Sequence, residues 1–133
     1  MDEPDLRQIK RRASFLAARS GASEARHSLV VQACKRADGG AWIGHGFTAT
    51  KRIGHAPARS RAKRRLREAA KQLLPGHGQP GWDYVFIARA RTGRVDWARL
   101  LDDMKSALVS LAARSDGGGP PRPARQAGAY KKI

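Results

Sequence analysis

The sequence predicts an α+β fold in which a small β-sheet packs against helices as a two-layer sandwich. Segments of helical and strand character follow one another along the 133 residues in the order helix, strand, strand, basic helix, strand, helix. A chain of this length favours one domain with one modest core. We place that domain at residues 9–114, between a flexible leader at 1–8 and a disordered basic tail at 115–133 that is rich in Gly and Pro.

The first helix is predicted between about Lys10 and Ser20, and Gly21 follows in a position that suits a helix C-terminus. Its apolar residues include Phe15, which is by default a core residue. The alternative is that Phe15 offers a stacking surface at the edge of a cleft beside the sheet.

Two strands are predicted next. Ser28–Lys35 is rich in β-branched residues, and the face that carries Gln32 is polar enough to look toward a ligand. Asp38-Gly39-Gly40 is typical of a hairpin turn. We therefore expect the following strand, Ala41–Ala49, to return alongside Ser28–Lys35.

A basic helix dominates the middle of the chain. The stretch Thr50–Lys71 holds nine Lys or Arg residues and a single acid, Glu68. Pro57 suits the first turn of a helix, which should end near Leu74, before the breaker Pro75–Gly81. Apolar residues at helical spacing form one stripe that should face the core: Ala62, Leu66, Ala69 and Leu73.

The last two elements are a strand and a helix. Trp82–Ala90 is the best strand in the chain, and we expect it at the centre of the sheet. Asp96 suits the N-cap of the final helix. That helix carries a core-facing stripe at helical spacing: Trp97, Leu100, Leu101, Met104, Leu108 and Leu111.

The charge balance indicates a polyanionic partner. The chain has 27 Lys and Arg against 11 Asp and Glu, a formal net charge of +16, which is typical of nucleic-acid-binding proteins. A membrane surface is the main competitor, but the basic helix lacks the bulky Trp and Phe of membrane-surface helices. No segment approaches the ~18 apolar residues that span a bilayer. Because the first residues are acidic, unlike those of a signal peptide, we expect a cytoplasmic protein.

No arrangement of side chains in the sequence suggests catalysis by the protein itself. The four His residues lack the i, i+4 spacing of a helical metal pair, and Cys34 is alone, so it makes no zinc site. Asp102 and Asp103 are adjacent, so on a helix they point in different directions. We expect no catalytic residue and no metal site on this chain.

One run of residues resembles a family signature. Arg59 to Glu68 matches seven of the eight specified positions in Arg-Asn-Arg, any residue, Lys-Arg, any residue, Leu-Arg-Glu, and Ser60 replaces the Asn. This is the signature of the bacterial ribonuclease P protein subunit. Thr50–Ala56 resembles the approach to that helix in the family, and Asp83–Arg89 resembles its later strand. The order of elements also agrees from roughly Leu6 to Leu111.

The resemblance implies a ribosomal-protein-like fold with a mixed sheet and an unusual left-handed crossover into the basic helix. It implies a catalytic RNA partner that cleaves the 5′ leader from precursor tRNA with Mg²⁺, so the protein would be the non-catalytic subunit of an endoribonuclease. No cofactor held by the protein, no membrane and no obligate protein partner is expected.

The site residues that the resemblance implies form two groups. Those expected to face the catalytic RNA lie in the signature helix and the loop before it: Lys51, Arg52, Arg59, Ser60, Arg61, Lys63, Arg64 and Arg67. Those expected to line a leader-binding cleft between the first helix and the sheet are Phe15, Arg12, Arg19, Gln32 and Lys35. The family often presents an aromatic side chain at the position of Gln32.

A second hypothesis is a structural RNA-binding protein of the ribosomal type, with no link to catalysis. Adding the protein to the catalytic RNA and a precursor tRNA separates the two hypotheses, because only the first predicts faster removal of the leader.

Overall fold

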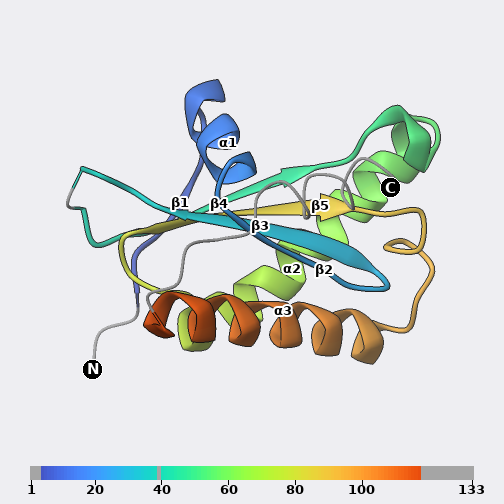
Figure 1. Ribbon diagram of the computed structural model, residues 1–133. Coiled ribbons are helices and arrows are strands. Elements are labelled where there is room, and N and C mark those ends of the chain that lie inside the picture. Colours follow the sequence, from blue (N-terminus) through green and yellow to red (C-terminus); the bar gives the residue numbers. More distant parts are fainter. Residues whose placement is uncertain (1–3, 39, 118–133) are drawn as a thin grey trace.

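The computed structural model describes residues 4–38 and 40–117 as a five-stranded mixed sheet with helices on both faces (Figure 1). Helix α1 lies on one face, and α2 and α3 cover the other, which confirms the α+β class and adds a partial third layer. The elements in chain order are β1 (Leu6–Gln8), α1 (Arg12–Arg19), β2 (Ala22–Ala25), β3 (Leu29–Lys35), β4 (Ile43–Thr48), the 3-10 helix η1 (Lys51–Ile53), α2 (Ala56–His77), β5 (Trp82–Ala88) and α3 (Trp97–Gly117).

The strands lie in the order β1-β4-β5-β3-β2, so β5 is central, as predicted. It pairs antiparallel with β3 and parallel with β4. The predicted hairpin between β3 and β4 is therefore wrong, because β5 lies between them. Six of the seven β5 residues are buried, and such an apolar strand is most stable with a neighbour on each edge.

Arg36 occupies the gap that β5 opens between the ends of β3 and β4. Its Nη1 donates to Asp83 Oδ1 at 2.7 Å, and its Nη2 donates to the carbonyls of Gly40 and Trp42. A side chain at Gly44 would collide with the Asp83 carboxylate, so a residue without Cβ is required there. This ion pair ties the turn after β3 to the two strands beside it.

Parallel neighbours need a crossover connection. The chain leaves β4, passes through η1 and α2, and returns in β5, so the basic helix lies in the crossover between these two parallel strands. Helix α2 runs three residues beyond the predicted end at Leu74 and includes Pro75 in its last turns.

Two edge strands were missed. β1 pairs parallel with β4, so the predicted flexible leader is wrong for Leu6–Gln8, and residues 1–3 lie outside the described part. β2 pairs antiparallel with β3. Helix α3 extends to Gly117, so the predicted tail begins with helical residues, and its remainder, 118–133, also lies outside the described part.

The main core lies between the sheet and helices α2 and α3. It contains one face of β3 together with the predicted stripe of α2. Leu73 of that stripe is only half-buried, whereas its neighbour Leu74 is buried. A smaller cluster lies beneath α1, where Ile9, Ala18, Val30, Val85 and Ile87 are buried, and Phe15 and Cys34 pack against them. The structure contains no helix, among the residues it describes, with the length and apolar character to cross a membrane.

Candidate nucleic-acid interface

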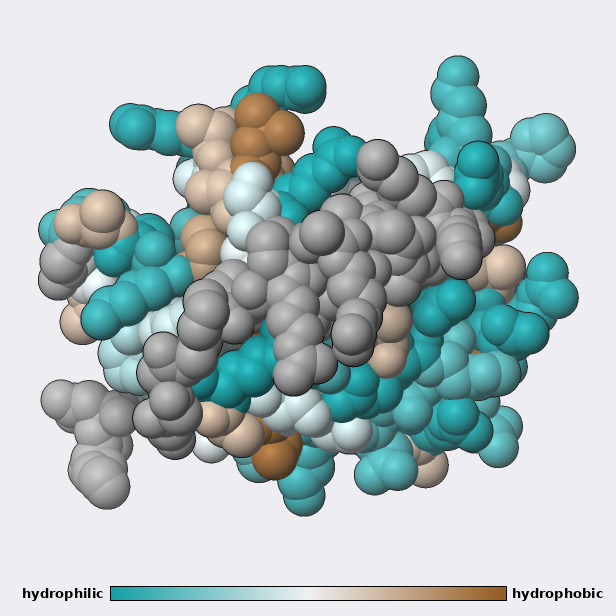
Figure 2. All heavy atoms as spheres, viewed as in Figure 1, coloured by the Kyte–Doolittle hydropathy of each residue, from teal (hydrophilic) through white to brown (hydrophobic). Residues whose placement is uncertain are grey.

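Helix α2 buries the small and apolar residues of the signature, and this fixes the direction in which the other signature residues point. Ala62 and Leu66 are buried in the main core, which turns the opposite arc of the helix to solvent. On that arc Ser60, Arg61, Arg64 and Arg67 are exposed, whereas Arg59 and Lys63 are half-buried. In Figure 2, hydrophilic side chains cover most of the surface at the side of the molecule where α2 begins.

The approach to this helix adds two more cations. Lys51 and Arg52 form most of η1 and are exposed. Gly54, which ends η1, has φ +139°, a conformation that L side chains rarely adopt. A glycine there lets the chain turn sharply from η1 into α2, so the loop and the helix present one continuous group of cations.

Arg65 belongs to the same helix but has a different role. Its Nη1 donates to the Thr92 carbonyl at 2.6 Å, and its Nη2 donates to the Val95 carbonyl at 2.7 Å. Its guanidinium also lies 5.7 Å from the Trp97 ring centroid. Arg65 therefore holds the loop between β5 and α3 against α2.

Residues that sequence reasoning missed lie in that loop. Arg91 and Arg94 are exposed, and Arg61 lies beside Gly93. Arg89 Nη1 and Thr92 Oγ1 anchor the loop through the carbonyls of Arg26 and Ser28, at 2.6 Å each. The only signal in the sequence was two arginines beside a Thr-Gly turn, which does not reveal that the loop packs against the basic helix.

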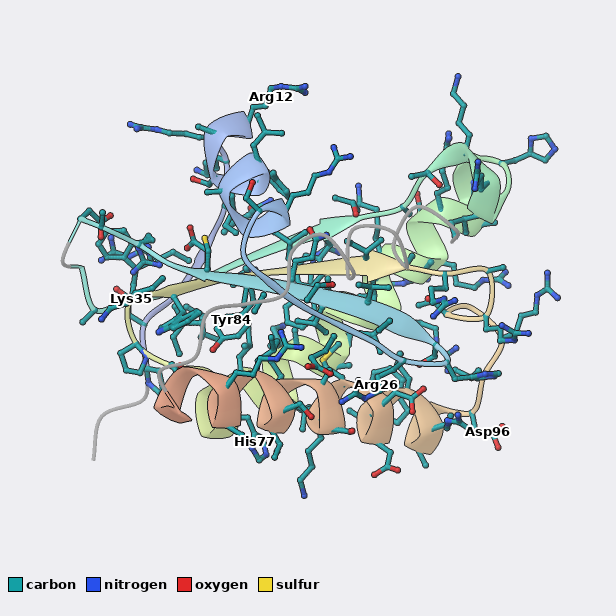
Figure 3. The ribbon with its side chains drawn as sticks, viewed as in Figure 1. Arg12, Arg26, Lys35, His77, Tyr84 and Asp96 are labelled. Atoms are coloured by element: carbon teal, nitrogen blue, oxygen red, sulfur yellow. The ribbon has the colours of Figure 1, made fainter. Side chains whose placement is uncertain are left out.

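The predicted leader-binding residues are only partly brought together. Phe15 is half-buried, and its ring fills the space above Gly46, where a Cβ would approach it to 2.7 Å. Arg12 and Arg19 are exposed on the same helix, and Figure 3 shows Arg12 projecting away from the sheet. Gln32 shares the sheet face of Val30, below α1, but is only 4% exposed.

Lys35 does not join this group. Side chains alternate along β3, and Lys35 follows Ala33 on the face that packs against α2 and α3. A residue three positions from Gln32 necessarily points to the other face of a regular strand. Arg12, Phe15 and Arg19 thus share one helix above the sheet, Gln32 lies in the sheet below it, and Lys35 lies on the opposite side.

The described part of the chain, 4–38 and 40–117, contains no group of three His, Cys, Asp or Glu residues placed to hold a metal ion. Burial raises the pKa of the Cys34 thiol to about 11, so the sulfur stays protonated and a weak nucleophile at neutral pH. The exposed cations of this surface suit the binding of an anionic polymer through its phosphates.

Comparison with known proteins identifies relatives of this chain. A family model described as Ribonuclease P matches residues 4–112. The ribonuclease P protein component of Caulobacter vibrioides is 52% identical over 112 residues, which cover 84% of this chain and 75% of that protein. The ribonuclease P protein component of Ruegeria pomeroyi is 48% identical over 107 residues, which cover 79% and 86% of the two chains.

Solved structures share the fold. The RNase P protein of Staphylococcus aureus matches with a TM-score of 0.64 and 25% identity over 79% of this chain and 94% of that one. The RNase P protein of Thermotoga maritima matches with a TM-score of 0.66 and 25% identity over 77% and 96%. Signature residues, fold and relatives agree, and this chain belongs to the ribonuclease P protein family.

Proposed function

We propose that this chain is the subunit of ribonuclease P that binds the catalytic RNA through η1 and α2. It also binds the 5′ leader of precursor tRNA along α1, and so assists endonucleolytic removal of that leader. Catalysis, with Mg²⁺, is assigned to the RNA, as the resemblance implies. The proposal includes a cytoplasmic location, no membrane partner and no obligate protein partner.

The observation that carries this proposal is the division of the signature helix into two arcs. Its small and apolar residues are buried in the core, whereas Arg61, Arg64 and Arg67 are exposed, as are Lys51 and Arg52 of η1. Guanidinium groups bind phosphates in bidentate fashion and release counterions, largely independently of base sequence. Such a surface suits a large folded RNA, whose backbone is the accessible feature.

The second surface suits a single strand. Phe15 is the aromatic residue of α1, and Arg12 and Arg19 lie on the same helix. An unpaired leader exposes base faces that an aromatic side chain can stack on, with cations along its backbone. The two surfaces lie on different faces of the sheet, so one protein could bind both RNAs at once.

A reconstituted cleavage assay tests this function. Precursor tRNA is incubated with Mg²⁺ and the catalytic RNA alone, the protein alone, or both together. We expect the protein alone to be inactive and the mixture to release the leader faster than the RNA alone. An unchanged rate would favour the ribosomal-type alternative, and cleavage by protein freed of RNA would contradict the assignment of catalysis to the RNA.

A further inference from the structure

A histidine occupies a core-facing position of β4. Ile43, His45 and Phe47 share one face of this strand, and Ile43 is buried in the main core. His45 is only half-buried, but its Nδ1 has no solvent contact and no hydrogen-bond partner among the described residues. Buried polar atoms are nearly always paired, so the described residues leave the hydrogen bonding of this imidazole ring incomplete.

His45 borders a cavity of about 240 Å³ between β1, β4 and α2. This volume lies just below the range of pockets for drug-sized ligands, so it suits a smaller flat group. The walls are apolar or aromatic, and the two cations come from α2. The residues that define this β4–α2 pocket are Leu6, His45, Phe47, Arg67, Lys71 and Leu74.

The aromatic wall is rigid. The Phe47 ring stacks on Phe86 with centroids 5.4 Å apart and an interplanar angle of 17°, so it is supported from behind. The Arg67 guanidinium lies 5.5 Å from the Phe47 ring centroid, and Arg67 and Lys71 are both exposed. Because Arg67 lies over the ring, a planar group could stack on Phe47 only if this exposed side chain moves aside. The displaced guanidinium, together with Lys71, would then lie near any phosphate attached to that group.

The protonation state of His45 suits contact with a nucleobase rather than with a phosphate. Burial, with the nearby charge of Arg67, lowers the pKa of the imidazole from its ordinary value, so the ring is neutral at pH 7. A neutral imidazole offers one donor and one acceptor. Nucleobase edges present the same pair of functions, whereas a phosphate offers acceptors alone.

We propose that the β4–α2 pocket takes one unstacked nucleobase of an RNA strand, with its phosphate on Arg67 and Lys71. The inference rests on the proposed function and adds to it a base contact beside the signature helix. Aromatic stacking combined with a cationic rim is how proteins hold single-stranded nucleotides. His45, Phe47 and Lys71 thereby become RNA-binding residues that the signature does not include.

Two variants test the pocket without removing a cation. His45→Val places an apolar residue on an apolar face, so Tm should stay the same or rise. Phe47→Leu keeps the apolar bulk but removes the ring. We expect each to weaken binding of the RNA that supplies the base, with an unchanged salt dependence. For Phe47→Leu the loss should be about fivefold or more, the effect of one lost base stack. Arg67→Gln should instead reduce the log–log salt slope by about one.

Arg64→Gln is the matched control, because Arg64 is exposed on the same helix but does not line the pocket. It should also reduce the salt slope by about one, since it removes a phosphate contact. It should leave base protection, described next, as in the wild type.

Base-specific chemical probing identifies the occupant. Reagents that modify the edges of all four bases are applied to the catalytic RNA and to precursor tRNA, each with wild-type protein. One base should become protected, and His45→Val should expose it again. Protection in the catalytic RNA or in the leader shows which strand supplies the base.

If neither variant weakens binding and no protected base depends on His45, the pocket proposal is wrong. The proposed function would still stand if wild-type protein accelerates cleavage. If the wild type neither binds the catalytic RNA nor accelerates cleavage, the proposed function itself fails.

Discussion

Neighbouring arginines in α2 have opposite roles, and their contacts separate them. Arg64 is exposed, whereas Arg65 donates two hydrogen bonds to backbone carbonyls of the loop between β5 and α3. A hydrogen bond from a charged group contributes about 1.5–3 kcal/mol to stability. The number of arginines in a basic helix is therefore a poor measure of its RNA-binding surface.

Arg65→Met should lower the free energy of unfolding by about 2 kcal/mol or more, because the Thr92 and Val95 carbonyls lose their charged donor. Arg64→Met should change it by about 0.5 kcal/mol at most, yet weaken binding of the catalytic RNA. Denaturant unfolding and RNA titration of both variants check this. Equal stability of the two would contradict the anchoring role of Arg65.

Asp103 predicts a pH dependence. Burial alone would raise the pKa of its carboxyl group, but hydrogen bonds from Ser28 Oγ, Arg99 and the Ser28 amide outweigh burial and lower it. A carboxyl group with a lowered folded pKa binds fewer protons in the folded state than in the unfolded state. Its stabilising effect is complete above the unfolded pKa of about 3.9 and is lost as the pH falls through the folded value.

The measurement compares wild type with Asp103→Asn in denaturant. The wild type should be more stable at about pH 6, and the difference should shrink as the pH falls below about 3.9 and through the lowered folded pKa, where Asp103 becomes protonated and neutral like Asn. A difference that stays constant across this range would mean that the charge of Asp103 contributes nothing.

At the scale of elements, hydrophobic periodicity predicted the helices and the long strands, but it did not predict which strands pair in the sheet. The alternation of β3 and the stripes of α2 and α3 are properties of local sequence, and the structure confirms them. The pairing of β3 with β5 depends on which strand is most apolar over the whole sheet. A strong Asp-Gly turn signal beside β3 therefore suggested a hairpin that the fold does not form.

The edge strands β1 and β2 could not be predicted, because they too depend on their neighbours in the sheet. Leu-Arg-Gln in β1 and Ala-Ser-Glu-Ala in β2 are three and four residues long and carry little apolar alternation. They are strands because β4 and β3 offer free edges to pair with. The pocket beside β1 was unpredictable for the same reason.

The candidate site also has some features that local sequence predicts and others that only the fold reveals. The outward cations of α2 followed from helical spacing together with the family signature. Strand alternation separates Gln32 from Lys35, because residues three positions apart in a regular strand lie on opposite faces, so the predicted cleft could not include both. Arg91 and Arg94 became visible only when the structure placed their loop beside Arg61.

Helix α1 carries a prediction of its own. Phe15 is half-buried over Gly46, so Phe15→Ala should cost less stability than the about 3–5 kcal/mol of a fully buried aromatic. It should lose about 1–3 kcal/mol of affinity for precursor tRNA, the contribution of one stacked base. Affinity for mature tRNA and for the catalytic RNA should not change.

Leu16→Ala is the matched control, because Leu16 is 44% exposed on the same helix and lies outside the cluster beneath it. It should leave both stability and leader affinity close to wild type. Thermal melts and binding to tRNA with and without the leader check both variants. A large loss of Tm in Phe15→Ala without a leader-dependent defect would make Phe15 a core residue only.

At the scale of the whole molecule, the net charge of +16 exaggerates the surface available to RNA. Arg36 is paired with Asp83, Arg26 with Glu24, and Arg65 and Arg89 donate to backbone carbonyls. These internal contacts join loops to the sheet. Among the described residues, the largest group of exposed cations lies on η1, α2 and the loop after β5, and a smaller group lies on and just before α1.

This distribution predicts how RNA affinity depends on salt. If about six phosphates are neutralised by the outward cations, the slope of log affinity against log salt concentration should be roughly −4 to −5. The slope counts phosphate contacts, so Arg61→Ala should flatten it by about one unit. Because Arg61 lies on α2 and not near α1, the same change should weaken binding of the catalytic RNA more than binding of the leader. Titrations of both RNAs at several salt concentrations check this, and a slope near zero for the wild type would mean that the outward face of α2 is not the binding surface.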